Sequence, residues 1–218
     1  ILIYLSARLV NIRPVFFRSS ALPASIASHG GRVCFDKQRA RQNGGQFDAR
    51  PLLQPALQGQ DMGLVSEAGM PAIADPGSSV VRAAHDLGVQ VVPLTGPMSL
   101  MLALASSGLN GQNFTFVGYL PQDAGERTQR IRELESLALK TGQTQIFIET
   151  PYRNLALWSA LIQTLQTQTR LAFSSGITLP DSMNQSATIQ QWRKTRPANG
   201  DAPDGLSNQT PAVFSIGA

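Results

Sequence analysis

The strongest constraint on the fold is an alternation, from residue 32 onward, between short apolar runs rich in β-branched residues and longer segments with helical spacing. The runs that we expect to form strands are Arg32–Phe35, Met62–Ser66, Val89–Leu94 and Phe114–Val117. Between them, residues 78–87 place apolar side chains at helical spacing and are followed by Gly88, which predicts a helix that ends there. Such alternation indicates an α/β fold in layers.

The second half of the chain repeats this pattern after a change in composition at Pro121. We expect helices over 122–140 and 154–166, strands over 145–149 and 211–216, a short helix over 21–27, and a flexible loop over 196–210. Pro121 ends the preceding strand, and the segment after it turns polar at once. We therefore predict two α/β domains, an amino-terminal one over 1–118 and a carboxyl-terminal one over 119–218.

Length and composition narrow the class of protein. The 218 residues suffice for two domains that each bury a core. A single cysteine, Cys34, excludes an internal disulfide framework and fits a reducing compartment, so we expect a cytoplasmic protein. With only two histidines, a zinc site is not indicated. Because no apolar stretch is long enough to cross a bilayer and no secretory signal is evident, we expect no membrane association.

The charge balance is basic, with 18 Lys and Arg against 14 Asp and Glu, a formal charge of +4 and a sequence pI near 9.7. This balance is compatible with a polyanionic partner such as RNA but is too small to establish one. Basic residues gather in three clusters, which are Lys37, Arg39 and Arg41; Arg127, Arg130 and Arg132; and Arg193, Lys194 and Arg196. Each cluster is open to two interpretations, ordinary helix-surface charge or RNA contact.

Residues 63–77, GLVSEAGMPAIADPG, form the most informative segment for function. An apolar strand there leads into a loop with two carboxylates, Glu67 and Asp75, among small residues. Its glycines permit backbone angles that other residues avoid, and its prolines restrict the alternatives, so the loop can present amide groups to a small molecule. The alternative is a plain strand-to-helix connection in which Asp75 caps the next helix.

Further strand-end loops occur at 93–99, 149–154 and 177–181. Open α/β sheets bind ligands at the carboxyl ends of their strands, so these loops are candidate ligand contacts. Each also has a simpler interpretation: the first as a proline-rich helix start, the third as an ordinary turn, and the second as a pairing of Glu149 with Arg153. Neither a G-x-G-x-x-G fingerprint nor a P-loop is present.

Taken in order, the motifs GLVSEAGMPAIADPG, VVPLTGPMSL, SSGL, FVGYLP, IFIETPYRN and ITLP resemble those of the tetrapyrrole methylase superfamily of S-adenosyl-L-methionine-dependent methyltransferases. The likeness is greatest to its ribosomal RNA branch, which includes small-subunit rRNA cytidine 2′-O-methyltransferases, and to a shorter subgroup. The resemblance implies two α/β domains with the cofactor in the cleft between them, usually in a homodimer.

The resemblance also implies a set of site residues. The positions that match cofactor-lining residues are Ala68, Gly69, Met70, Ile73, Met98, Ser99, Glu149, Ile177 and Thr178. A methyl acceptor that carries a proton needs a base, and we assign that catalytic role to Glu67 as a hypothesis. The sequence departs from the family pattern at Thr95, at Met98 and at 6–11, where members have proline, serine and a proline- and glycine-bearing loop.

These observations predict an S-adenosyl-L-methionine-dependent methyltransferase that acts on RNA, in the manner of rRNA 2′-O-methylation. Two alternatives stay open. One is a methyltransferase of a tetrapyrrole-like or other small molecule, and the other is a non-catalytic homologue that binds S-adenosyl-L-methionine.

Overall fold

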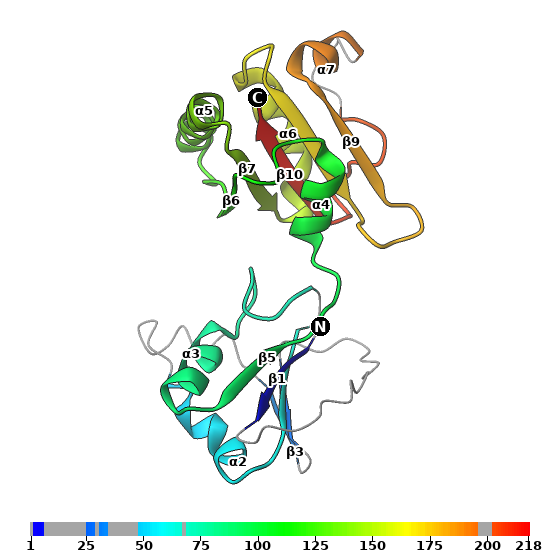
Figure 1. The fold of residues 1–218 in the computed structure, drawn as a ribbon. Helices are drawn as coiled ribbons and strands as arrows, with labels where there is room; N and C mark the ends of the chain where they lie inside the picture. The colour runs from blue at the N-terminus through cyan, green and yellow to red at the C-terminus, as the bar shows by residue number, and fades with distance from the viewer. Residues whose placement is uncertain (1, 7–24, 29–30, 35–47, 67–68, 196–201) are drawn as a thin grey trace. The chain divides into compact units, whose positions relative to one another are not determined.

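The computed structural model describes residues 2–6, 25–28, 31–34, 48–66, 69–195 and 202–218. The chain divides into two compact units, 1–98 and 99–218 (Figure 1). Each unit contains one five-stranded sheet with helices packed against it. The predicted α/β fold class is confirmed, and each unit has a hydrophobic core of its own.

The first unit is built on an antiparallel sheet with strand order β3-β2-β4-β1-β5. Its elements are β1 (Leu2–Ser6), β2 (Ser25–Ser28), β3 (Gly31–Cys34), the 3-10 helix η1 (Arg50–Leu53), α2 (Gln54–Leu57), β4 (Met62–Val65), α3 (Ser78–Asp86) and β5 (Gln90–Pro93). The predicted strand, helix and strand over 62–94 are confirmed. β1 lies between β4 and β5 and is antiparallel to both, so these two run parallel to each other without being neighbours.

The predicted short helix over 21–27 is wrong where the structure describes it. Residues 25–28 form β2, which pairs with β3 on one side and with β4 on the other. Pairing on both sides satisfies the backbone groups of this short segment, whereas an isolated helix of similar length is marginal in water. Residues 21–24 lie outside the described part of the chain.

Helix α3 closes the core of the first unit. Its apolar side chains Val80, Ala83 and Ala84 are buried at helical spacing and lie in one cluster with Leu64 of β4 and Leu53 of η1. Gly88 follows the helix with φ of 69°, a left-handed conformation that glycine adopts at little cost. The loop between β4 and α3 is therefore fixed at both ends by buried side chains.

The second unit is built on a mixed sheet with strand order β6-β7-β10-β8-β9, in which β6 and β7 are parallel and the other pairs antiparallel. Its elements are α4 (Ser99–Ser107), β6 (Phe114–Tyr119), α5 (Ala124–Thr141), β7 (Thr144–Glu149), the 3-10 helix η2 (Pro151–Arg153), α6 (Asn154–Thr164), β8 (Arg170–Ser175), β9 (Met183–Thr188), α7 (Ile189–Thr195) and β10 (Ala212–Gly217).

Aromatic side chains dominate the core of this unit. Phe214 of β10 lies directly opposite Phe147 of β7 and Phe173 of β8, and the rings of Phe147 and Phe214 stack at 6.1 Å. Trp158 of α6 meets Phe173 edge-on at 5.8 Å and Trp192 of α7 at 5.1 Å. Edge-to-face geometry of this kind adds about 0.5–1.5 kcal/mol per pair to the burial itself.

The division of the chain at 98/99 places α4 and β6 with the second unit. The sequence-based division at 118/119 follows the polar turn after Tyr119. In the structure β6 pairs in parallel with β7, and α4 packs on β10, β8 and β9, so both elements contribute to the second sheet layer. The side-chain contact between Ser106 of α4 and Ser174 of β8, 3.4 Å between hydroxyl oxygens, belongs to this packing.

Candidate functional site

The loop between β4 and α3 has an unusual backbone. Four residues within 69–77 have positive φ, namely Gly69 at 76°, Ala72 at 67°, Ala74 at 54° and Gly77 at 139°. For an alanine this conformation costs about 1–2 kcal/mol, and such residues persist where the surrounding structure fixes them, often at ligand-binding loops. The backbone therefore favours the ligand-loop interpretation of 63–77 over a plain connection.

Asp75 holds this loop to the end of β4. The Ser66 hydroxyl donates a hydrogen bond to Asp75 Oδ2 at 2.5 Å. The residue that precedes α3 is Gly77, and no side chain caps the helix there. The alternative in which Asp75 caps α3 is therefore wrong, and the contact supports a structural role for this carboxylate.

Glu149 lies at the carboxyl end of β7 and is buried. Its Oε1 accepts hydrogen bonds from the Thr150 amide at 2.7 Å, from the Thr150 hydroxyl at 3.2 Å and from Arg153 Nη2 at 2.5 Å. The exposed fraction of the side chain is 1% for Glu149 and 19% for Arg153. The pairing interpretation of Glu149 and Arg153 is thus confirmed. This carboxylate fixes the turn η2, which leads into α6.

A second polar group lies at the same edge of the sheet. Ala212 of β10 pairs with Glu149 on one side and with Ser175, the last residue of β8, on the other. Directly opposed residues project from the same face of a sheet, so Glu149 and Ser175 flank Ala212 on one face. The Ser175 hydroxyl is buried without a hydrogen-bond partner among the described residues. Sequence reasoning missed Ser175 because a serine at the end of an apolar strand gives no signal of its own.

The structure places the predicted cofactor residues in two groups. Gly69, Met70, Ile73 and Met98 belong to the first unit, and Ser99, Glu149, Ile177 and Thr178 to the second. Within the second unit, Glu149 and the turn with Ile177 and Thr178 lie at the carboxyl ends of β7 and β8, which both neighbour β10. Ser99 is the first residue of α4 and is exposed. The predicted residues Glu67 and Ala68, and the segment 7–11, lie outside the described residues.

The basic clusters do not all lie free on the surface. Arg193 donates from Nε and Nη2 to the Ile162 carbonyl at 3.0 and 2.6 Å and from Nη2 to the Leu165 carbonyl at 2.9 Å, and thereby caps the end of α6. On α5, Arg130 pairs with Glu133 at 3.1 Å. Arg193 thus has a structural role. Four of the clustered basic residues lie outside the described part of the chain, namely Lys37, Arg39, Arg41 and Arg196.

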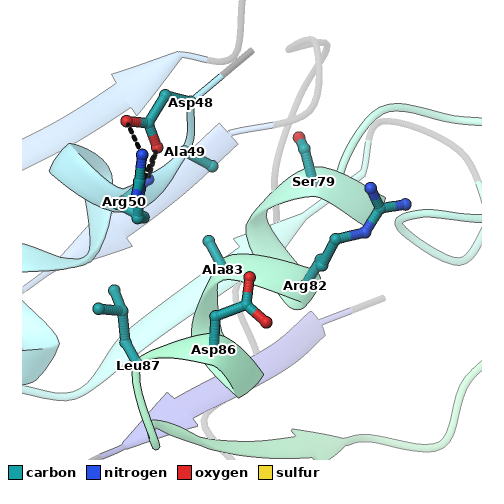
Figure 2. A pocket seen from close by; sticks show the side chains of 8 residues that line it. All are labelled: Asp48, Ala49, Arg50, Ser79, Arg82, Ala83, Asp86 and Leu87. Atoms are coloured by element: carbon teal, nitrogen blue, oxygen red, sulfur yellow. Dashed lines mark hydrogen bonds and ion pairs between the residues drawn. The ribbon is translucent and has the colours of Figure 1, made fainter. Parts of the chain in front are cut away.

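The first unit contains a shallow hollow of about 260 Å³ beside α3, shown in Figure 2. It is lined by Asp48, Ala49, Arg50, Ser79, Arg82, Ala83, Asp86 and Leu87. Arg50 and Asp48 form an exposed ion pair at 2.8 Å, and the hydrogen bond from Arg50 lowers the pKa of Asp48 below its usual 3.8. None of the predicted site residues that the structure describes lines this hollow, so it is separate from both groups described above.

The residues that the structure describes contain neither a metal-binding cluster nor a membrane-spanning helix. No group of three or more His, Cys, Asp and Glu side chains there is placed to hold a metal ion. None of the described helices combines the length and the apolar character that a membrane span requires.

Comparison with known proteins identifies the protein family of this chain. The profile of the family Tetrapyrrole (Corrin/Porphyrin) Methylases matches residues 15–191, and the chain belongs to this family. This confirms the resemblance that the ordered motifs indicated.

Similar proteins include two named Ribosomal RNA small subunit methyltransferase I. The one from Mesorhizobium japonicum is 37% identical over 66% of this chain and 48% of its own length. The one from Pseudomonas aeruginosa is 40% identical over 53% of this chain and 38% of its own length. A solved structure, of the methyltransferase CobJ, has a TM-score of 0.47 and 15% identity over 79% of this chain and 72% of that one. The chain thus spans about half or less of the length of the relatives.

Proposed function

We propose that the chain is an S-adenosyl-L-methionine-dependent methyltransferase that acts on RNA, with a ribosomal RNA 2′-hydroxyl as acceptor. The observation that carries the proposal is the identity of 37% and 40% to relatives named as rRNA methyltransferases, within a family of methylases. The basic charge balance supports a polyanionic substrate.

The described residues offer the types of polar group that would bind S-adenosyl-L-methionine. The backbone of 69–77, with four residues at positive φ, can present amide groups to the polar parts of an adenosyl or aminoacyl moiety. The Ser175 hydroxyl is a buried group still able to form a hydrogen bond. The residues proposed to bind the cofactor are Ala68, Gly69, Met70, Ile73, Met98, Ser99, Glu149, Ile177 and Thr178. Glu149 would act through the turn that it holds, because its Oε1 already accepts three hydrogen bonds.

S-adenosyl-L-methionine, when bound, supplies a methyl group that is already activated by the sulfonium. The protein then has to hold donor and acceptor in line, and positioning of this kind can lower a barrier by up to roughly 7–11 kcal/mol. Transfer would form a bond from the acceptor oxygen to the methyl carbon and break the bond from that carbon to sulfur, which leaves as the thioether of the demethylated product. The proton of the acceptor oxygen would pass to a base. We propose Glu67 for that role, since in the sequence it directly precedes Ala68 and Gly69, two of the residues proposed to contact the donor.

Isothermal titration with S-adenosyl-L-methionine and with its demethylated product tests the donor site. We expect both to bind, and no binding of either would favour a non-catalytic homologue. Tritium transfer into small ribosomal subunits from a strain that lacks the enzyme tests the acceptor. We expect label in the rRNA, and its absence despite donor binding would exclude the rRNA proposal.

Glu67→Gln tests the proposed base. The variant should retain the affinity for the donor product, because the amide is isosteric with the carboxylate, and it should lose about 10²- to 10⁴-fold in turnover, the usual contribution of a general base. Unchanged turnover would exclude Glu67 from the chemistry.

Methylation of a tetrapyrrole-like or other small molecule is a second candidate, favoured by the description of the family itself. Tritium transfer to such a ring but not to RNA would support it. We further propose a cytoplasmic homodimer. Light scattering on the purified chain tests the dimer, and a monomeric mass would contradict it.

A further inference from the structure

Two tyrosines in the second unit are far more exposed than aromatic residues usually are. The exposed fraction is 58% for Tyr119 and 66% for Tyr152, the two highest values among the large apolar and aromatic residues that the structure describes. Aromatic rings normally bury most of their large surface or serve in an interface. Their exposure therefore indicates a role in binding and not in packing.

Both tyrosines lie at the carboxyl edge of the sheet, beside the candidate cofactor residues. Tyr119 is the last residue of β6 and pairs with Ile148 of the parallel strand β7. Glu149 follows Ile148 and ends β7, and Tyr152 lies in the turn η2 directly after it. The two rings thus follow the ends of neighbouring parallel strands.

Each ring is attached to a fixed stretch of backbone. Arg153 Cζ lies 5.9 Å from the centroid of the Tyr152 ring, and Glu149 holds this same guanidinium by its buried ion pair. Tyr119 lies between Gly118, which has φ of 76° at an irregularity of the strand pairing, and the buried Leu120. Little conformational freedom of the backbone is left to lose when a ligand stacks on these rings.

We propose that Tyr119 and Tyr152 form a stacking platform for unpaired bases of the RNA substrate next to the site of methyl transfer. This inference rests on the proposed function and specifies its substrate as single-stranded at this edge. Proteins read unpaired RNA by stacking splayed bases on aromatic rings, and the Arg153 guanidinium lies over the Tyr152 ring, where it holds that ring in place for stacking.

An RNA strand fits these features better than a single tetrapyrrole ring does. Tyr119 ends the strand β6 and Tyr152 lies in the turn η2 after the neighbouring strand β7, so the two rings suit successive bases of one chain. Helix α5 follows Tyr119 in the sequence and carries Arg132, an exposed cationic side chain for a phosphate, whereas Arg130 pairs with Glu133 and Arg127 donates to the Gln122 carbonyl. A porphyrin carboxylate is the competing ligand, and the test below separates the two.

The test measures binding of the 218-residue chain to a fluorescein-labelled single-stranded RNA oligonucleotide. Tyr119→Leu and Tyr152→Leu remove the ring but keep an apolar side chain, and Tyr152→His restores a planar ring. Phe114→Leu is the matched control, because Phe114 is an exposed aromatic at the opposite end of the same strand, β6. Titration with the demethylated product of the donor and with a porphyrin carboxylate accompanies each variant.

We expect each Tyr→Leu variant to lose roughly 5- to 150-fold in RNA affinity, the range measured for stacking on one base. Phe114→Leu should bind as the wild type does, and Tyr152→His should recover most of the loss. Because tyrosine is uncharged, the slope of log K for RNA binding against log salt concentration should stay the same, while log K itself should be lower at every salt concentration. Donor-product affinity should not change.

Three results would overturn the inference. The first is equal RNA affinity in the Tyr→Leu variants and in Phe114→Leu. The second is that the Tyr→Leu variants lose affinity for the donor product or the porphyrin and keep their affinity for RNA. The third is failure of the wild type to bind single-stranded RNA. The first of these leaves the proposed function intact if the variants still transfer methyl groups to rRNA. Absence of methyl transfer to rRNA in the wild type would instead contradict the proposed function itself.

Discussion

Gly77 shows how a single residue shapes the loop after β4. Its φ of 139° is strained for any residue with a side chain, and an added Cβ would lie 2.9 Å from Leu64 Cδ2 and 3.2 Å from the Ala72 amide nitrogen. The second of these contacts is with backbone, which cannot move away without moving the loop. Both the backbone angle and the packing of the buried β4 thus require glycine at this position.

Gly77→Ala should therefore lower the free energy of unfolding by about 2–4 kcal/mol, from backbone strain and from overpacking together. Urea denaturation followed by far-UV circular dichroism measures the change. Gly88→Ala is the matched control, because Gly88 also has positive φ but has nothing within 4 Å of an added Cβ, so strain alone applies. Equal losses in the two variants would show that the contacts with Leu64 and Ala72 relax freely.

Glu149 and Arg153 are a buried ion pair, unlike the exposed pair of Arg130 and Glu133. Glu149→Gln leaves the Arg153 guanidinium without its counter-charge, and breaking a buried pair on one side costs about 3–5 kcal/mol. Glu133→Gln should cost less than about 0.5 kcal/mol, since exposed pairs contribute little. Chemical denaturation of both variants compares them. A small loss in Glu149→Gln would mean that the neutral amide still holds the turn η2.

At the scale of elements, α5 carries a helix cap whose effect depends on pH. The Asp123 side chain accepts a hydrogen bond from the Glu126 amide at 2.9 Å. This bond lowers the pKa of Asp123 below its usual 3.8, since the amide dipole favours the charged carboxylate. A group whose pKa is lower in the folded state stabilises it above the unfolded pKa, and this stabilisation is lost as the pH falls through the folded pKa.

We therefore expect Asp123→Asn to lower the Tm at about pH 7 and to have a smaller effect as the pH falls below the usual 3.8 and through the lowered pKa of Asp123. The amide still accepts the capping hydrogen bond but has no charge to lose. Thermal unfolding of wild type and variant across this pH range gives the difference. Asp181→Asn, at an exposed carboxylate in a turn outside the helices, is the control. A difference that stays constant with pH would contradict the charge-dependent cap.

The elements that could be predicted from the sequence are those with strong periodicity or clear end signals. Helix α5 carries Ile131, Leu134 and Ala138 at helical spacing, and the strand β7 is a dense apolar run. The strand β9, Met183–Thr188, was missed because its mostly polar residues lack the alternation of a half-buried strand; only its pairing with β8 defines it. Likewise β2 is set by its two neighbours and not by local propensity.

The candidate site likewise has parts that local sequence patterns predict and parts that they do not. The motif after β4 and Glu149 at the end of β7 could be located by their sequence patterns, and so could the turn with Thr178. Three features depend on how the chain folds and could not: the bond from Ser66 to Asp75 across the loop, the burial of the Ser175 hydroxyl, and the role of Arg193 as a cap of α6. Each is decided by tertiary packing, which local pattern does not encode.

At the scale of the whole molecule, each unit has a core that, among the described residues, contains no residue of the other unit. Leu53, Leu64 and Val80 belong to the core of the first unit, and Leu161 and the aromatic rings to that of the second. Both tryptophans of the chain, Trp158 and Trp192, lie in the second core. Tryptophan fluorescence therefore reports unfolding of the second unit alone, whereas far-UV circular dichroism reports both.

This distribution predicts that the two units respond separately to core substitutions. Leu53→Ala and Leu161→Ala remove the same atoms from two fully buried sites, and each should cost about 2–5 kcal/mol in its own unit. In urea, Leu161→Ala should shift the fluorescence midpoint, and Leu53→Ala should shift only the part of the circular dichroism change that the first unit contributes. An equal fluorescence shift in both variants would show that the chain unfolds as one cooperative unit, because damage to either core would then destabilise both.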